Sequence, residues 1–163
     1  KGIMSLIIGF VLLIIYILIN YRLLGIFANI SLLVNLILLL GTLTLIEATL
    51  TLPGIAGIIL TVGMAVDANV LIYERIKEEL LIEKNIMIAF DNGYKRVLTT
   101  LLDANITTLI AAIVLYFIGS GPVKGFAVTL AVGIITSLFT TFILGRLFVA
   151  SYVKSKKGEM IKI

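Results

Sequence analysis

Long apolar runs separated by short polar segments dominate the sequence. They occupy residues 3–19, 23–46, 55–73, 98–117 and 126–144. The runs are continuous rather than alternating between polar and apolar positions, and a helix needs about 20 apolar residues to cross a bilayer. The pattern predicts an all-α, polytopic membrane protein, with five transmembrane helices bundled within residues 1–153 and a basic tail at 154–163.

The shorter polar segments predict how neighbouring helices are joined. Asn20, Tyr21 and Arg22 leave room only for a tight turn, so the first two helices should form a hairpin. Gly-Ser-Gly-Pro at 119–122 marks a loop before the last helix, because glycine and proline favour turns.

Residues 74–97 form the longest polar stretch, and we expect a helical connector there between the third and fourth spans. Arg75 and Glu79 stand at i,i+4 spacing, which favours a continuation of the third helix beyond the membrane. A break near Lys84 would start a second helix, with apolar residues at helical spacing at 86, 90, 94 and 97. Such a stripe predicts an amphipathic helix lying in the membrane interface.

Composition agrees with a membrane protein and excludes several kinds of site. The sequence is 61% hydrophobic and 13% charged, and its mean hydropathy is +1.22. A typical soluble domain is about 45–50% apolar and about 25% charged. Because the chain has no Cys and no His, it lacks thiolate and imidazole metal ligands and the commonest general base. We therefore expect no cofactor, no metal and no enzymatic activity.

Basic residues are distributed unevenly over the two sides of a five-span bundle. Eleven of the 13 Lys and Arg fall on the side that holds residues 74–97 and the C-terminus, whereas Lys1 and Lys124 fall on the other. Basic loops remain in the cytoplasm. The N-terminus is therefore predicted to lie outside and the C-terminus in the cytoplasm. This bias accounts for the net charge of +4, and no nucleic-acid partner is expected.

Asp67 interrupts the third span near its middle. An ionised side chain at the centre of a bilayer costs about 3 kcal/mol or more, so such a residue faces a bundle interior, pairs with a partner or is protonated. A carboxyl in a low-dielectric site can bind and release a proton. Ion or proton coupling is the favoured role for Asp67, and a carboxyl that only holds helices together is the alternative.

Asp103 interrupts the fourth span at a depth similar to that of Asp67, counted by helical rise. Thr99, Thr100 and Thr107 fall on the same face, so this span would turn a polar stripe toward Asp67 and support a relay. A helix cap or a carboxylate near the interface is an equal alternative for Asp103.

Small residues indicate where helices pack closely. They are Gly54, Gly57 and Gly63 in the third span, Ala111 and Ala112 in the fourth, and Gly133 in the fifth. The fifth span also carries a polar face, Thr136, Ser137, Thr140 and Thr141. This face either lines a path or bonds its own backbone, and the sequence leaves the choice open.

Three ordered motifs resemble the SecD family of protein-export membrane proteins. They are LPGIAGI at 52–58 with GMAVDANVLIYERIKEE at 63–79, DANITTLIAA at 103–112, and GPVKGFAVTL at 121–130. The resemblance covers nearly the whole chain. The related SecF family fits less well, because it carries Asn-Asp-Thr where this chain has Asp67-Ala68-Asn69.

The resemblance implies a role in the Sec pathway at the inner membrane of a prokaryote, within the resistance-nodulation-division superfamily. Members pair with SecF beside the SecY channel complex, in contact with membrane lipids. They use the proton gradient, or a sodium gradient in some members, to help unfolded secretory proteins finish crossing. Asp67 matches the coupling aspartate of the family, and Asp103 and Asn69 are the second candidates.

Two departures from the family pattern qualify this assignment. The family places a first span and a large extracytoplasmic domain before the five spans, so the resemblance implies the C-terminal membrane half of a longer protein. Lys1, rather than Met, at the first position agrees with this. No Lys or Arg lies deep in the five spans, so SecF would supply the charge that faces Asp67.

Two other functional classes are alternatives. An ion-coupled lipid or drug exporter of the same superfamily would also place a carboxylate in the third span. A non-transporting assembly subunit would use Asp67 only to hold a partner helix, and it predicts that Asn serves as well as Asp at this position.

Overall fold

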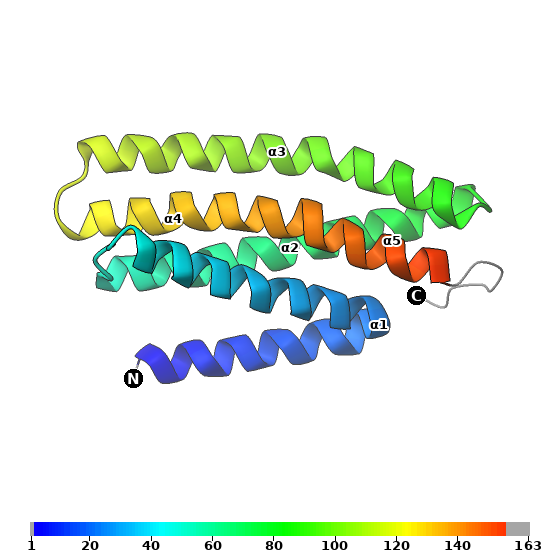
Figure 1. Ribbon diagram of the computed structural model, residues 1–163, viewed down its shortest axis with the longest axis horizontal. Coiled ribbons are helices and arrows are strands. Elements are labelled where there is room, and N and C mark those ends of the chain that lie inside the picture. Colours follow the sequence, from blue (N-terminus) through cyan, green and yellow to red (C-terminus); the bar gives the residue numbers. More distant parts are fainter. Residues whose placement is uncertain (1, 156–163) are drawn as a thin grey trace.

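The computed structural model describes residues 2–155, and all regular secondary structure in this range is helical. The elements are α1 (Gly2–Leu45), α2 (Leu52–Ile82), α3 (Ile86–Ile118), α4 (Pro122–Phe139), the π-helical segment η1 (Thr140–Gly145) and α5 (Arg146–Ser155). The long helices lie side by side in one bundle (Figure 1). The all-α prediction is confirmed, while residues 156–163 of the predicted basic tail lie outside the described residues.

Four helical segments in the described chain are long and apolar enough to cross a membrane. They are Leu24–Leu45, Leu52–Ile82, Ile86–Ile118 and Pro122–Phe148. The segment Ile7–Arg22 is apolar but shorter. Helices of sufficient length thus correspond to four of the predicted spans, and a fifth crossing by the first segment stays a prediction.

α1 folds back on itself at Arg22, where the backbone leaves helical geometry with φ 44° and ψ −112°. Gly25 lets the two halves approach, because a Cβ at this position would lie 2.6 Å from the carbonyl oxygen of Ile17. Tyr21 and Leu24 are buried beside the turn. The tight turn predicted at residues 20–22 is therefore confirmed.

α2 and α4 form the closely packed centre of the bundle. A Cβ on Gly57 would lie 3.3 Å from the side chain of Thr129, and a Cβ on Gly133 would lie 2.4 Å from that of Thr61. These contacts advance in the same direction along both helices, so α2 and α4 run parallel. Close packing is confirmed at Gly57 and Gly133, whereas a Cβ on Gly63 would meet nothing within 4 Å.

Thr51 fixes the start of both central helices. Its hydroxyl oxygen accepts a hydrogen bond from the backbone N–H of Gly54 at 3.1 Å, which caps α2. The same hydroxyl donates to the carbonyl oxygen of Pro122, the first residue of α4, at 3.2 Å.

The junction between α2 and α3 differs from the predicted connector. α2 ends at Ile82, and the side chain of Asn85 caps α3 by accepting from the N–H of Met87 at 3.0 Å. The predicted break near Lys84 is confirmed. The separate interfacial helix is wrong, because α3 continues without interruption from Ile86 to Ile118.

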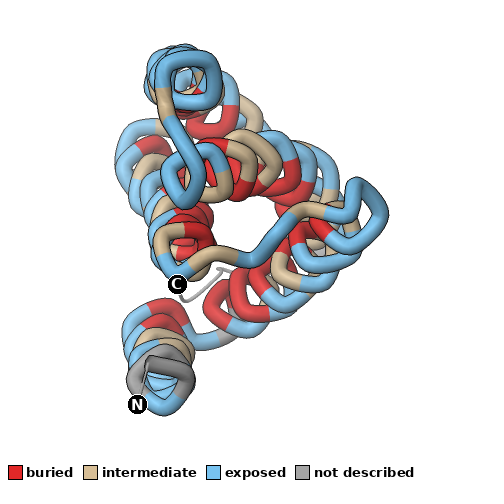
Figure 2. The backbone as a smooth tube through the Cα atoms, turned by 90° about the vertical axis from the view of Figure 1, so that its left-hand side faces the viewer, coloured by how far each residue is buried: buried red, intermediate tan, exposed pale blue. Residues whose placement is uncertain are grey.

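The apolar stripe at the start of α3 is buried by α2 rather than by the membrane interface. Phe90, Tyr94 and Val97 belong to the same core as Ile76 of α2. Gly93 allows this contact, because a Cβ there would lie 3.1 Å from the backbone of Ile76. Farther along, α3 is the least buried of the four long helices, and its outer side is exposed (Figure 2).

Candidate functional site: the groove between α2 and α3

Asp67 lies in the apolar part of α2, on a side that the other described helices leave uncovered. Its side chain is exposed, and its carboxylate takes part in no hydrogen bond or ion pair with residues 2–155. It therefore does not face the interior of this bundle, which was one of the environments expected for it. Two of the expected environments are left for Asp67: a partner outside the described residues, or a bound proton that neutralises the carboxylate.

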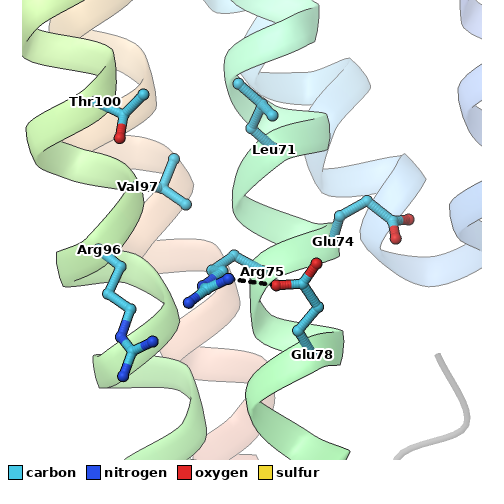
Figure 3. Close-up of a pocket in the computed structure, with 7 residues that line it drawn as sticks. All are labelled: Leu71, Glu74, Arg75, Glu78, Arg96, Val97 and Thr100. Carbon is cyan, nitrogen blue, oxygen red and sulfur yellow. Dashed lines mark hydrogen bonds and ion pairs between the residues drawn. The ribbon is translucent and has the colours of Figure 1, made fainter.

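A pocket of about 380 Å³ opens between α2 and α3 on the same side of the molecule (Figure 3). Its lining residues are Leu71, Glu74, Arg75 and Glu78 from α2, and Arg96, Val97 and Thr100 from α3. Charged side chains surround one end of the pocket, and Leu71, Val97 and Thr100 form the other end.

Asp67 and Asp103 flank the continuation of this groove. Asp67 precedes Leu71 by four residues, which is one helical turn along the same face, and Asp103 follows Thr100 by three. Both carboxylates are exposed. Because Leu71 and Thr100 line one pocket, the two aspartates lie at a similar level on neighbouring helices. Their coupling role stays a prediction.

The three threonines predicted to support Asp103 are exposed and differ in their bonding. The hydroxyl of Thr107 donates to the carbonyl oxygen of Asp103 at 2.8 Å, so it is used within its own helix. Thr99 and Thr100 form no side-chain hydrogen bond within residues 2–155. Thr100 therefore combines an unused hydroxyl with a place in the pocket wall.

Asn69 is buried on another side of α2 and faces η1. A Cβ on Gly145 would lie 3.7 Å from Oδ1 of Asn69 and 3.8 Å from the hydroxyl oxygen of Tyr94. Two residues along a helix correspond to a rotation of about 200°, so Asn69 turns away from the groove. The structure does not bring it together with Asp67 and Asp103.

Glu79 makes a contact with α3 at this site that the sequence did not predict. It is 4% exposed, and its carboxylate lies 3.2 Å from the guanidinium of Arg96 and 3.6 Å from that of Arg75. Arg75 also pairs with Glu78. The i,i+4 spacing indicated the contact with Arg75, but no sequence signal links Glu79 to a residue on α3. The buried carboxylate thus holds both arginines of the pocket in place.

Tyr94 and η1 form a second polar contact that the sequence did not predict. The buried hydroxyl of Tyr94 donates to the carbonyl oxygen of Thr141 within η1. In the same segment the hydroxyl of Thr140 donates to the carbonyl oxygens of Thr136 and Ser137 at 3.0 and 3.1 Å. The hydroxyl of Thr140 is therefore used within its own helix. Of the two roles considered for the polar face of this helix, Thr140 supports bonding to its own backbone.

Comparison with known proteins places this arrangement in a family. A family model described as protein export membrane protein SecD/SecF, C-terminal, matches residues 1–155. The chain belongs to this family. The resemblance to SecD that the three motifs indicated is thereby confirmed.

Curated relatives and a solved structure agree with this assignment. The SecD protein translocase subunits of Magnetococcus marinus and Calditerrivibrio nitroreducens are 48% and 53% identical over 163 residues, all of this chain, which covers 31% and 32% of them. The crystal structure of SecDF from Thermus thermophilus, described as a translocon-associated membrane protein, superposes with a TM-score of 0.91 at 41% identity. That alignment covers 99% of this chain and 23% of the solved one. The chain thus spans about a third of the length of these curated relatives.

Proposed function

We propose that this chain is the ion-coupling membrane part of a SecD-type subunit of the Sec protein-export machinery. Five spans would cross the cytoplasmic membrane of a prokaryote, with the N-terminus outside and the C-terminus in the cytoplasm. The names of the relatives support a transport role in translocation rather than a catalytic one. The SecY channel complex and unfolded secretory proteins are the partners that this role requires.

The observation that carries the proposal is the exposed carboxylate of Asp67, which has no hydrogen-bond or ion-pair partner within residues 2–155. A carboxylate that faces hydrocarbon costs at least several kcal/mol in most estimates, so intramembrane acids face protein or water. A partner helix that covers this face of α2 would give Asp67 such protein surroundings. The family resemblance supports SecF as that partner, and SecF would supply the charged or polar groups opposite Asp67.

Asp67 would bind and release a proton or a sodium ion as the two subunits move relative to each other. One elementary charge that crosses a potential of 100 mV releases about 2.3 kcal/mol, which is the energy each cycle can deliver to the emerging chain. Asp103 and Thr100 would assist from α3. Asn69 keeps only a positioning role, because it faces η1.

The test is export of a signal-peptide reporter in cells depleted of SecD and complemented with the full-length protein that carries Asp67→Asn. Asn keeps the shape and removes the titration, so export should fall to the depleted level while protein abundance and SecF co-purification stay normal. Glu47→Gln, an exposed carboxylate in the loop before α2, serves as the matched control and should export normally.

Full export with Asp67→Asn would contradict ion coupling and favour an assembly subunit in which Asp67 only bonds a partner helix. Loss of SecF co-purification together with export would likewise point to assembly rather than to titration. A lipid or drug exporter would leave reporter export unaffected by either variant.

A further inference from the structure

Gly145, at the end of η1, leaves a small polar space inside the bundle. A Cβ at this position would lie 3.7 Å from Oδ1 of Asn69, 3.8 Å from the carbonyl oxygen of Thr140 and 3.8 Å from the hydroxyl oxygen of Tyr94. These are ordinary van der Waals separations, so the space has room for one methyl group. The three oxygens belong to α2, η1 and α3, and three elements therefore converge on it.

Gly54 shows the same kind of surroundings without the space. The three atoms nearest to its Cβ position are also oxygens, but the hydroxyl oxygens of Thr51 and Thr129 would be only 3.2 and 3.3 Å away. Both hydroxyls donate to backbone carbonyls of the protein. Gly145 differs because its neighbours leave room between them.

Each oxygen around Gly145 is able to accept a hydrogen bond. Asn69 is 3% exposed, and its side chain forms no hydrogen bond within residues 2–155. The hydroxyl of Tyr94 already donates its hydrogen to the carbonyl oxygen of Thr141, so its oxygen can only accept here. The carbonyl oxygen of Thr140 has two lone pairs. The space therefore lacks a donor, and buried polar groups without a partner are costly.

Water suits this space better than a cation does. It supplies two hydrogens, and a buried water in a protein makes about three hydrogen bonds. Placed slightly farther from the backbone than a Cβ, it comes within reach of the oxygens, because O–H···O bonds span about 2.7–2.8 Å. The guanidinium carbon of Arg146 lies 5.8 Å from the centre of the Tyr94 ring, so a positive charge is already close and would repel a second one.

Two buried side chains of α1 point independently to water beside η1. Oγ of Ser31 and Oδ1 of Asn35 have no hydrogen-bond partner within residues 2–155, although these residues are 2% and 1% exposed. Both share one helix face with Phe27, because the three follow one another at intervals of four. Phe27 stacks on Phe148, and the second half of α1 runs opposite to the helix that contains η1 (Figure 1). Ser31 and Asn35 therefore lie level with residues 140–145.

We propose that η1 binds a small cluster of ordered water inside the bundle, with one molecule in the space at Gly145 and others beside Ser31 and Asn35. Asn69 holds the first molecule by accepting one of its hydrogens. This gives Asn69 a role separate from that of Asp67, because it lies on a side of α2 that turns away from the groove.

The direct test is a structure of the full-length protein with SecF, at a resolution that shows ordered water, for the natural sequence and for Gly145→Ala. We expect density about 2.7–3.0 Å from Oδ1 of Asn69 in the natural protein. It should be missing in the variant, where the new methyl group takes the space. Further density should contact Ser31 and Asn35. A natural protein without density at Gly145 would overturn the proposal.

Hydrogen exchange of the η1 amides, measured by mass spectrometry on the same complex, distinguishes a wet space from a dry one by its sign. If water is bound, Gly145→Ala leaves three oxygens without a donor, and exchange should become at least about threefold faster. If the space is dry, the methyl group fills it and Ala is the better helix former, so exchange should slow by about the same factor. Slower exchange would therefore overturn the proposal.

Gly41→Ala is the matched control, because Gly41 is exposed and a Cβ there would meet nothing within 4 Å. Exchange around position 41 should slow or stay unchanged, which reports helix propensity alone. Replacing choline by sodium or potassium at constant ionic strength should not alter exchange in η1. Slower exchange in either salt would assign the space to a cation and refute the water. None of these outcomes depends on Asp67→Asn, so the water site and the proposed function fail separately.

Discussion

Gly133→Ala measures how tightly α4 is packed on α2. A Cβ at position 133 would lie 2.4 Å from Cγ2, 2.7 Å from Cβ and 2.8 Å from Oγ1 of Thr61. Thr61 cannot turn away, because it is 1% exposed and its hydroxyl donates to the carbonyl oxygens of Gly57 and Ile58, each at 3.0 Å. Rotation about χ1 would only exchange one branch of this β-branched side chain for another.

The two helices must therefore separate. Non-bonded carbon atoms pack at about 3.5–4.0 Å, so the nearest contact falls short by about 1 Å. Overpacking of this kind costs about 1–3 kcal/mol, and the better helix propensity of Ala returns at most about 1 kcal/mol. We expect a net loss of about 1–2 kcal/mol in the free energy of unfolding.

The assay is reversible unfolding by a denaturing detergent in mixed micelles, followed by circular dichroism. Gly41→Ala is the control, because Gly41 is exposed and a Cβ there would meet nothing within 4 Å. It should leave stability unchanged or raise it. In a double-mutant cycle, Thr61→Gly should offset the Gly133→Ala loss with a coupling of at least about 1 kcal/mol. If Gly133→Ala behaved like Gly41→Ala, the packing derived for α2 and α4 would be wrong.

Further predictions concern the buried polar contacts of Glu79 and Tyr94. Glu79→Gln should lower the free energy of unfolding by about 1–3 kcal/mol, because it leaves two guanidinium groups without their buried carboxylate. Detergent unfolding measures this loss, with the exposed Glu78→Gln as a control that is expected to cost less than about 1 kcal/mol. Equal losses in the two variants would refute the prediction. Tyr94→Phe should cost about 1–2 kcal/mol, because the carbonyl of Thr141 loses its side-chain donor. Tyr116→Phe on the same helix is its control, since Tyr116 is 46% exposed, and a Tyr94→Phe protein as stable as this control would show that the hydroxyl contributes nothing.

The helices were predictable because a bilayer allows few other structures. A backbone in hydrocarbon must satisfy its own polar groups, so long apolar runs become helices, and the polar residues 20–22 become the turn at Arg22. The close helix packing at Gly57 and Gly133 was likewise predictable, because small residues let helix backbones approach each other.

The environment of each helix face was less predictable. The stripe containing Phe90 and Tyr94 has the same period whether membrane or protein covers it, and only the fold shows that α2 does. The pairing of Glu79 with Arg96 joins two helices and leaves no local signal. The sequence could have predicted that Asn69 and Asp67 lie on different sides of α2, since residues two apart on a helix point to different sides.

The π-helical geometry of η1 accommodates one extra residue within the last helix. A π turn contains one residue more than an α turn in its hydrogen-bonded ring, so deleting a residue from Thr140–Gly145 would restore α geometry and leave the helix beyond it close to its present orientation. Phe148 would then keep its place beside Phe27, 5.8 Å away between ring centroids, and Arg146 would keep Asp91 at 3.6 Å. A natural sequence that is one residue shorter in this segment can therefore retain the same partners on α1 and α3, so the length of this helix is free to vary by one residue at η1 without a change elsewhere in the bundle.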